Sequence, residues 1–169
     1  MSIIAVVPGT YDPITEGHLD IIERATNIFD EVHILVAVNL EKRTWFTPEE
    51  RVDMIQGAVA GEDFSSKLVI AQYEGLTVDY CSDVNANTIV RGLRNAADFD
   101  YEIMISNINV RLNYTVDTIF LPCSPDLTHI SSSAVKELAM MGRMLKELVP
   151  GNVRRKLEER VNLIKKIKQ

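Results

Sequence analysis

Two hydrophobic periods alternate along the chain. Five short runs, rich in valine and isoleucine, are nearly continuous in apolar residues, which is typical of strands buried on both faces of a sheet. These runs are Ile3–Val7, His33–Val38, Lys67–Ala71, Thr88–Val90 and Thr118–Leu121. Longer segments between and after them have the three- and four-residue apolar spacing of amphipathic helices. The predicted helices are Gly17–Phe29, Pro48–Val59, Leu76–Asp83, Ala97–Leu112, Ser132–Met141 and Val153–Ile167.

This alternation predicts an α/β fold, namely a doubly wound, parallel, five-stranded sheet with helices on both faces. No repeat, low-complexity segment or internal linker divides the 169 residues, so we expect a single domain over residues 1–169. The last helix, about residues 152–168, is expected to dock on it. Ligands of such sheets bind beyond the carboxyl ends of the strands. Polar residues that directly follow a predicted strand are therefore the first candidates for a functional site.

The segment GTYDPITEGH, residues 9–18, follows the first strand. Gly9 and Gly17 allow the backbone to approach a ligand closely, and Gly17 opens a helix whose free N–H groups favour a phosphate. His18 shares a helical face with Ile22 and Ala25, which places it above the strand ends. An isolated histidine there is more often structural, but in this motif we favour a functional role. The helix N-terminus opposes an imidazolium and a nearby triphosphate favours one, so the charge of His18 stays open.

Arg91 and Arg94 flank a glycine after the fourth strand. One guanidinium group can donate two hydrogen bonds to the oxygens of a phosphate. We therefore favour phosphate binding over surface ion pairs with Asp98, Asp100 or Glu102.

Two other polar segments follow predicted strands. Lys42 and Arg43 follow the second strand and alone would indicate only a solvated loop. Ser131, Ser132 and Ser133 open a helix, where serines cap the helix or cradle an anion.

Composition and charge exclude several classes of protein. No apolar run reaches the roughly 20 residues of a membrane span, and Met1–Pro8 is interpreted as a strand, not a signal peptide. The two cysteines, Cys81 and Cys123, indicate a reducing cytoplasm. A net charge of −6 argues against broad binding to nucleic acid. Residues 151–169 carry seven basic and two acidic residues; a docked helix with a solvated basic face is favoured there over a membrane or nucleic-acid contact.

Several catalytic motifs are missing from the sequence. It has no Walker loop, dinucleotide fingerprint, nucleophile elbow or His/Cys metal cluster, so no metal ligand from protein side chains is expected. No obvious protein nucleophile stands among the candidate residues. This combination favours direct in-line transfer, in which the enzyme supplies positioning and electrostatic stabilisation.

Three segments in this order and spacing, GTYDPITEGH, RGLRNAADFDYE and ISSS, closely resemble the phosphopantetheine adenylyltransferase family of bacterial coenzyme A synthesis. The T-x-G-H and ISSS elements mark the wider nucleotidyltransferase superfamily, which includes cytidylyltransferases and class I aminoacyl-tRNA synthetases. The RGLR…DFDYE segment and the short chain narrow the resemblance to this family. It extends over almost the whole chain, from about Ile3 to the last helix.

The resemblance implies a Rossmann-like fold and a homohexamer. It also implies adenylyl transfer from Mg²⁺-ATP to 4'-phosphopantetheine, which gives 3'-dephospho-coenzyme A and pyrophosphate, with no nucleic-acid or membrane partner. The implied catalytic residues are His18, Thr10 and Lys42, with His18 stabilising the transition state. The implied ATP-binding residues are Thr10, Tyr11, His18, Gly92, Leu93, Arg94, Glu102, Thr128, His129, Ile130, Ser131, Ser132, Ser133 and Ala134. The implied phosphopantetheine-binding residues are Thr10, Lys42, Thr77 and Arg91.

The sequence departs from the family pattern at a few positions. Tyr11 replaces a usual Phe, Asn39–Glu41 replace a Pro-containing loop, and Thr44-Trp45 stand where a Pro is common. Two alternatives remain open at this stage: a sister nucleotidyltransferase with another nucleotide or acceptor, and a non-enzymatic nucleotide-binding module. A nucleotide panel separates the first from adenylyl transfer, and failure to release pyrophosphate from ATP would support the second.

Overall fold

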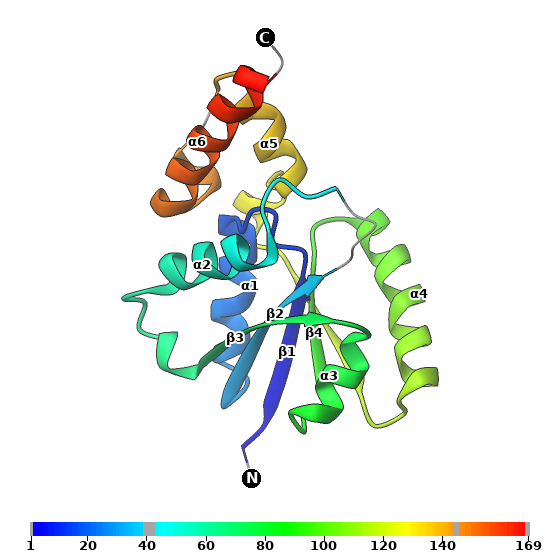
Figure 1. The fold of residues 1–169 in the computed structure, drawn as a ribbon. Coiled ribbons are helices and arrows are strands. Elements are labelled where there is room, and N and C mark those ends of the chain that lie inside the picture. The colour runs from blue at the N-terminus through cyan, green and yellow to red at the C-terminus, as the bar shows by residue number, and fades with distance from the viewer. Residues whose placement is uncertain (1, 39–42, 144–145, 168–169) are drawn as a thin grey trace.

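A computed structural model describes residues 2–38, 43–143 and 146–167 and shows one five-stranded sheet (Figure 1). All strand pairs are parallel, and the spatial order is β3-β2-β1-β4-β5. The strands are β1 (Ile4–Gly9), β2 (Glu31–Val38), β3 (Leu68–Glu74), β4 (Thr88–Leu93) and β5 (Asp117–Pro122). The predicted parallel five-stranded α/β fold is therefore confirmed.

Helices cover both faces of the sheet, as predicted. The helices α1 and α2 pack on one face, and α3 and α4 lie on the other (Figure 1). The helix α6 packs against α2 and α5 beyond the carboxyl ends of the strands. The bounds are α1 (Glu16–Thr26), α2 (Pro48–Val59), α3 (Thr77–Asp83), α4 (Ala96–Leu112), α5 (Ser132–Met140) and α6 (Gly151–Ile167), with short 3-10 turns η1 (Ser65–Lys67), η2 (Pro125–Leu127) and η3 (Lys146–Leu148).

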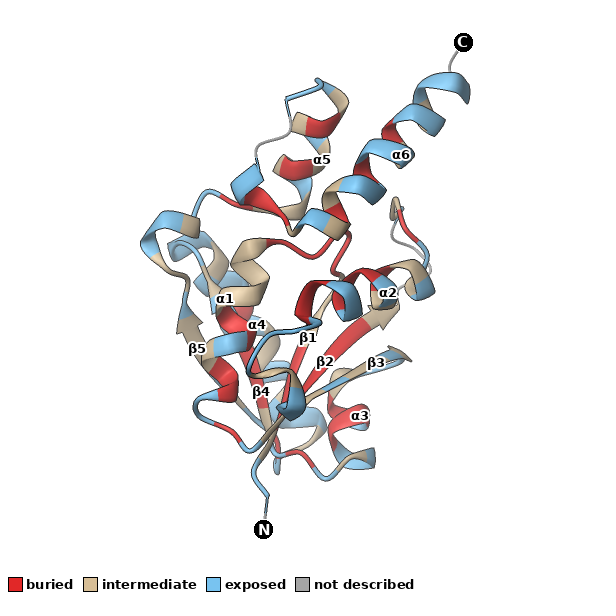
Figure 2. Cartoon of the chain, turned by 90° about the vertical axis from the view of Figure 1, so that its left-hand side faces the viewer, coloured by how far each residue is buried: buried red, intermediate tan, exposed pale blue. Residues whose placement is uncertain are grey.

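The core lies on both sides of the central strands (Figure 2). In β1, Ala5 and Val7 face the α1/α2 cluster, whereas Val6 between them faces α3, as the two-residue period of a strand requires. The edge strands differ from the predicted pattern of two-sided burial. Val69 in β3 is 38% exposed and Ile119 in β5 is 40% exposed, because each edge strand has only one neighbour.

Two element boundaries matter for the site. The predicted fourth strand ends at Val90, but β4 continues to Leu93, so Arg91 and Gly92 lie within the strand and pair with β5. Strands β1 and β4 pair only at their starts and then diverge. Beyond the paired positions, the Arg91 guanidinium donates to the carbonyl of Pro8 on β1.

Helix α1 also differs from its prediction. It ends at Thr26, before the predicted end at Phe29, and the amides of Asn27 and Ile28 bond to carbonyls three residues earlier. Phe29 remains buried beyond the helix end.

Candidate active site

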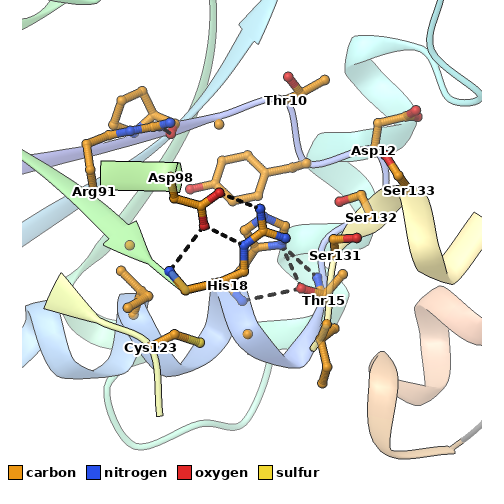
Figure 3. Close-up of a pocket in the computed structure, with 18 of the residues that line it drawn as sticks. Thr10, Asp12, Thr15, His18, Arg91, Asp98, Cys123, Ser131, Ser132 and Ser133 are labelled. Carbon is orange, nitrogen blue, oxygen red and sulfur yellow. Dashed lines mark hydrogen bonds and ion pairs between the residues drawn. The ribbon is translucent and has the colours of Figure 1, made fainter. Parts of the chain in front are cut away.

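A cavity of about 500 Å³ opens at the carboxyl ends of β1 and β4 (Figure 3). From β1 the chain adds β2 and β3 toward one edge of the sheet, and then β4 and β5 toward the other edge. The strand order therefore reverses between β1 and β4. Ligands of open α/β sheets bind at such a switch point. Loops after β1, β2 and β5, the end of β4 and the starts of α1, α4 and α5 supply the cavity wall.

A second cavity of about 250 Å³ shares part of that wall. Thr10, Arg91 and Glu102 line both cavities. Thr77, at the start of α3, and residues of α4 line only the smaller one. Two ligand-sized spaces therefore meet at Thr10 and Arg91.

Tyr11 fixes the loop after β1. Its φ of 50° is in the left-handed region, its ring is 2% exposed, and its hydroxyl donates to the Val7 carbonyl at 2.8 Å. A Cβ at Gly9 would approach the Tyr11 ring to 2.8 Å, so glycine is required beside it. Burial raises the pKa of the Tyr11 phenol, which therefore stays neutral. The Tyr11 hydroxyl thus anchors the loop, and the ring meets His18 edge-on at 5.0 Å between centroids.

Asp12 links three separate segments at the cavity wall. Its carboxylate is 3% exposed and accepts hydrogen bonds from the amides of Trp45 and Phe46 and from Lys136 Nζ at 2.6 Å. Because these partners lie 33 to 124 residues away in sequence, the motif alone did not reveal them. Asp12 therefore holds the loop after β2 and helix α5 against the loop after β1.

His18 is the third residue of α1 and closes its N-terminus. The Thr15 amide donates to His18 Nδ1 at 3.0 Å, and the Thr15 hydroxyl lies 2.9 Å from the same nitrogen (Figure 3). Burial, with smaller contributions from Arg91 and Arg94, lowers the pKa of His18 to about 4. The lowered pKa and the hydrogen bond that Nδ1 accepts from the Thr15 amide both favour a neutral imidazole at pH 7.

Both arginines line the cavity, and both also form ion pairs. Arg91 donates to Glu102 at 2.7 and 2.5 Å, and Arg94 donates to Asp98 at 2.9 and 3.0 Å. The hydrogen bonds from Arg94 hold the pKa of Asp98 below its usual range. Phosphate binding and ion pairing, the two roles considered for these arginines, are therefore compatible, because each guanidinium lines the cavity and also has a carboxylate partner. Glu102, implied to bind ATP, holds Arg91 in this structure.

The serine segment, Ser131–Ser133, both caps helix α5 and lines the large cavity. Ser131 caps α5 by accepting from the Ala134 amide at 3.1 Å, and the Ser132 hydroxyl donates to the Pro13 carbonyl at 2.8 Å. Ile130 and all three serines line the large cavity.

Not every implied ligand-binding residue reaches a cavity. Of the implied ATP-binding residues, Leu93, Thr128, His129 and Ala134 do not line either cavity wall. Thr128 and His129 are exposed on the turn before α5. Lys42 lies outside the described residues, while Arg43 and Thr44 line the large cavity.

Among the residues of the wall to which sequence reasoning assigned no role in the site are Asp12, Thr15, Cys123 and Lys136. Thr15 carried a usable signal, because the three-residue spacing from Thr15 to His18 is that of a capping box, although His replaces the usual Glu or Gln. Lys136 follows the serine segment on α5 and gave no comparable signal.

The described residues contain no group of three or more His, Cys, Asp or Glu side chains that could hold a metal ion. The carboxylates of the large cavity, Asp12, Asp98 and Glu102, are each paired with a cation. Across the described ranges, no helix is long and apolar enough to cross a membrane.

Two comparisons with known proteins bear on this site. The sequence profile of the cytidylyltransferase-like family matches residues 6–138. The fold is similar to that of a putative nicotinate-nucleotide adenylyltransferase from Vibrio parahaemolyticus, with a TM-score of 0.70 and 16% identity over 95% of each chain. The matched residues include β1 from Val6 onward, the T-x-G-H start of α1, Arg91, Arg94 and the serine segment.

Proposed function

The chain belongs to the cytidylyltransferase-like family of nucleotidyltransferases, and on that premise we propose that it transfers the adenylyl group of ATP to 4'-phosphopantetheine. One observation carries the proposal. The T-x-G-H start of α1, the end of β4 and the serine start of α5 converge on one cavity, and a smaller cavity shares Thr10 and Arg91 with it. The resemblance of the RGLR…DFDYE segment to phosphopantetheine adenylyltransferases supports the choice of nucleotide and acceptor.

We assign one cavity to each substrate. ATP would occupy the larger one, with its phosphates between the starts of α1 and α5, near Arg94 and Lys136. The acceptor would occupy the smaller one, with its phosphate near Arg91 and its chain toward Thr77 and α4. The reacting groups would then meet at Thr10, on the wall that both cavities share.

The reaction would proceed by direct displacement. A 4'-phosphate oxygen of the acceptor forms a bond to the α-phosphorus of ATP as the bond to the bridging oxygen of the β-phosphate breaks, and pyrophosphate leaves. The attacking phosphate is already ionised at neutral pH, so no general base is needed. A neutral His18 can donate a hydrogen bond to the non-bridging oxygens, where charge builds up. Its contribution would be greatest in the transition state.

Magnesium would enter with the nucleotide. Mg²⁺ commonly binds through substrate phosphates and keeps several waters, and the carboxylates of the large cavity already have cation partners. The ion would neutralise charge on the phosphates. Arg94 and the N-terminal amides of α1 and α5 would orient them.

Incubation with ATP and 4'-phosphopantetheine, followed by mass spectrometry for 3'-dephospho-coenzyme A and an assay for pyrophosphate, tests the proposal. CTP replaces ATP in one arm, and nicotinate mononucleotide replaces the acceptor in another. Product only with ATP and 4'-phosphopantetheine supports the assignment. Product only in another arm would point to a sister nucleotidyltransferase, and no pyrophosphate in any arm would contradict nucleotidyl transfer.

A further inference from the structure

The start of α1 has an unusual capping box. In the common form, a Ser or Thr at the N-cap is paired with a Glu or Gln three residues later, whose side chain accepts from the N-cap amide. Here the N-cap is Thr15, and the accepting side chain is the imidazole of His18. The helix α2 provides the common form in the same chain, with Thr47 at the N-cap and Glu50 as acceptor.

This substitution determines where the imidazole carries its proton. A backbone N–H only donates, so Nδ1, which lies 3.0 Å from the Thr15 amide, accepts and carries no hydrogen. In a neutral ring the hydrogen is then on Nε2. The Thr15 hydroxyl reinforces this state, since it accepts from the His18 amide at 3.4 Å and lies 2.9 Å from Nδ1, where its hydrogen can donate.

The other ring nitrogen is available to a ligand. Among the described residues, His18 Nε2 has no hydrogen-bond partner, and the ring lines the large cavity. The Tyr11 ring packs edge-on against the imidazole and restricts its rotation. Thr15 is 1% exposed, so its hydrogen bonds to Nδ1 are shielded from solvent.

We propose that Thr15 is a positioning residue whose amide and hydroxyl hold His18 as the Nε2–H tautomer, with that N–H directed at the reacting phosphate. The helix cap and the catalytic donor are thus one structural unit. The effect of the tautomer on catalysis rests on the proposed adenylyl-transfer function. The tautomer itself does not depend on any substrate.

Nitrogen-15 NMR tests the tautomer on the full-length protein, with the His18 signals assigned by comparison with His18→Gln. Long-range proton–nitrogen spectra at pH 7 should show a protonated Nε2 and an unprotonated Nδ1. A protonated Nδ1, or an even mixture of the two tautomers in the wild-type protein, overturns the proposal. If the spectra agree but no acceptor is adenylylated, only the proposed function fails.

Variants separate positioning from capping. Thr15→Val keeps the backbone donor to Nδ1 but removes the hydroxyl, so the second tautomer should become detectable only as a minor species. It should lower kcat on the order of 10-fold with little change in KM for ATP, by analogy with the loss of an outer partner of a metal-binding histidine. Thr15→Ser keeps the hydroxyl and should restore both readouts. The matched control is Thr47→Val, which removes the corresponding cap of α2. It should lower the melting temperature like Thr15→Val but leave the His18 spectrum and kcat unchanged. Equal effects of Thr15→Val and Thr47→Val on kcat would reduce Thr15 to a structural cap.

Discussion

At the residue scale, the site pairs a neutral donor with two positive groups. Arg91 and Arg94 supply the permanent charge, and their field helps keep the nearby imidazole of His18 uncharged. A neutral imidazole binds the ground-state phosphate less strongly than an imidazolium would. Its hydrogen bond can therefore strengthen as negative charge develops on the phosphate during transfer. Only an interaction that is stronger in the transition state than in the ground state accelerates the reaction.

His18→Ala should consequently lower kcat by roughly 10²–10³, the size expected for one preorganised donor. The affinity for ATP should change little, because Arg94 and the N-termini of α1 and α5 remain. Steady-state kinetics and calorimetric titration with ATP measure the two quantities. Near-normal kcat, or a loss explained entirely by failure to bind ATP, would rule out this role for His18.

The two arginines should divide their work between the substrates. Arg94 lines only the large cavity, whereas Arg91 lines both. We expect Arg94→Ala to raise KM mainly for ATP and Arg91→Ala to impair mainly the phosphopantetheine step. Each loss should be on the order of 2–4 kcal/mol in transition-state stabilisation. Equal effects of both variants on both substrates would contradict this division.

The Arg91 variant needs a stability control. Its removal leaves Glu102, 9% exposed, without its cation partner, which should also destabilise the fold. Glu102→Gln combined with Arg91→Ala removes the unpaired charge. The double variant should recover folding stability without recovering activity.

At the scale of single elements, the start of α1 should respond to acid. Protonation of His18 removes the acceptor of the Thr15 amide and places a positive charge at a helix N-terminus. Its pKa is lowered from 6.5 to about 4 in the folded protein, so between these values the unfolded chain binds more protons. Stability due to this group should therefore fall as the pH drops through that window, by at most about 3 kcal/mol.

Urea unfolding at several pH values between 7 and 4 measures the effect. His18→Gln keeps a side-chain acceptor for the cap but does not titrate, so its stability should fall less over the same range. Parallel pH profiles of the two proteins would show that His18 titrates normally in the folded state.

Element-scale comparison also shows what the sequence could predict. Apolar periodicity located all five strands and six helices, because burial on a sheet face leaves a repeating pattern. It misjudged the end of β4, since Arg91 and Gly92 interrupt the apolar run although the strand continues beside β5. Motif spacing placed Arg91, His18 and Ser131 near one another. The partners of Asp12 were not predictable, because contacts across long sequence separations depend on how the loops are packed.

At the scale of the whole molecule, the metal dependence should be separate from folding. Among the described residues no cluster of ligands could hold an ion, so the ion needed for turnover should arrive with ATP. Chelator should abolish turnover but leave the melting curve of the protein without nucleotide unchanged. A marked loss of thermal stability with chelator would instead indicate a metal held by the protein.

Helix α4 carries large apolar side chains that the described part of the chain does not cover. Of its 17 residues, all of them described, Glu102 is the one that is buried. Its exposed large apolar side chains lie on two sides of the helix. Phe99, Ile103 and Val110 share one side, and Tyr101, Met104, Ile108 and Leu112 share the other. Clustered exposed apolar residues on a folded protein commonly mark an interface. The sequence had suggested Met140, Met141 and Met144 for this purpose; Met141 is 64% exposed, Met140 is half-buried, and Met144 lies outside the described residues.

We therefore expect a symmetric homo-oligomer, a hexamer if the family resemblance holds, in which α4 is buried between copies. Light scattering should report a mass well above the 19.0 kDa of one chain. Ile108→Glu combined with Leu112→Glu places charges in the apolar surface without touching either cavity, and should shift the protein toward smaller species because burying unpaired carboxylates is unfavourable. Leu163→Glu on α6, at a side chain 51% exposed, is the matched control and should leave the mass unchanged. A wild-type monomer at micromolar concentration would contradict the assembly, and dissociation by the α6 variant alone would move the interface away from α4.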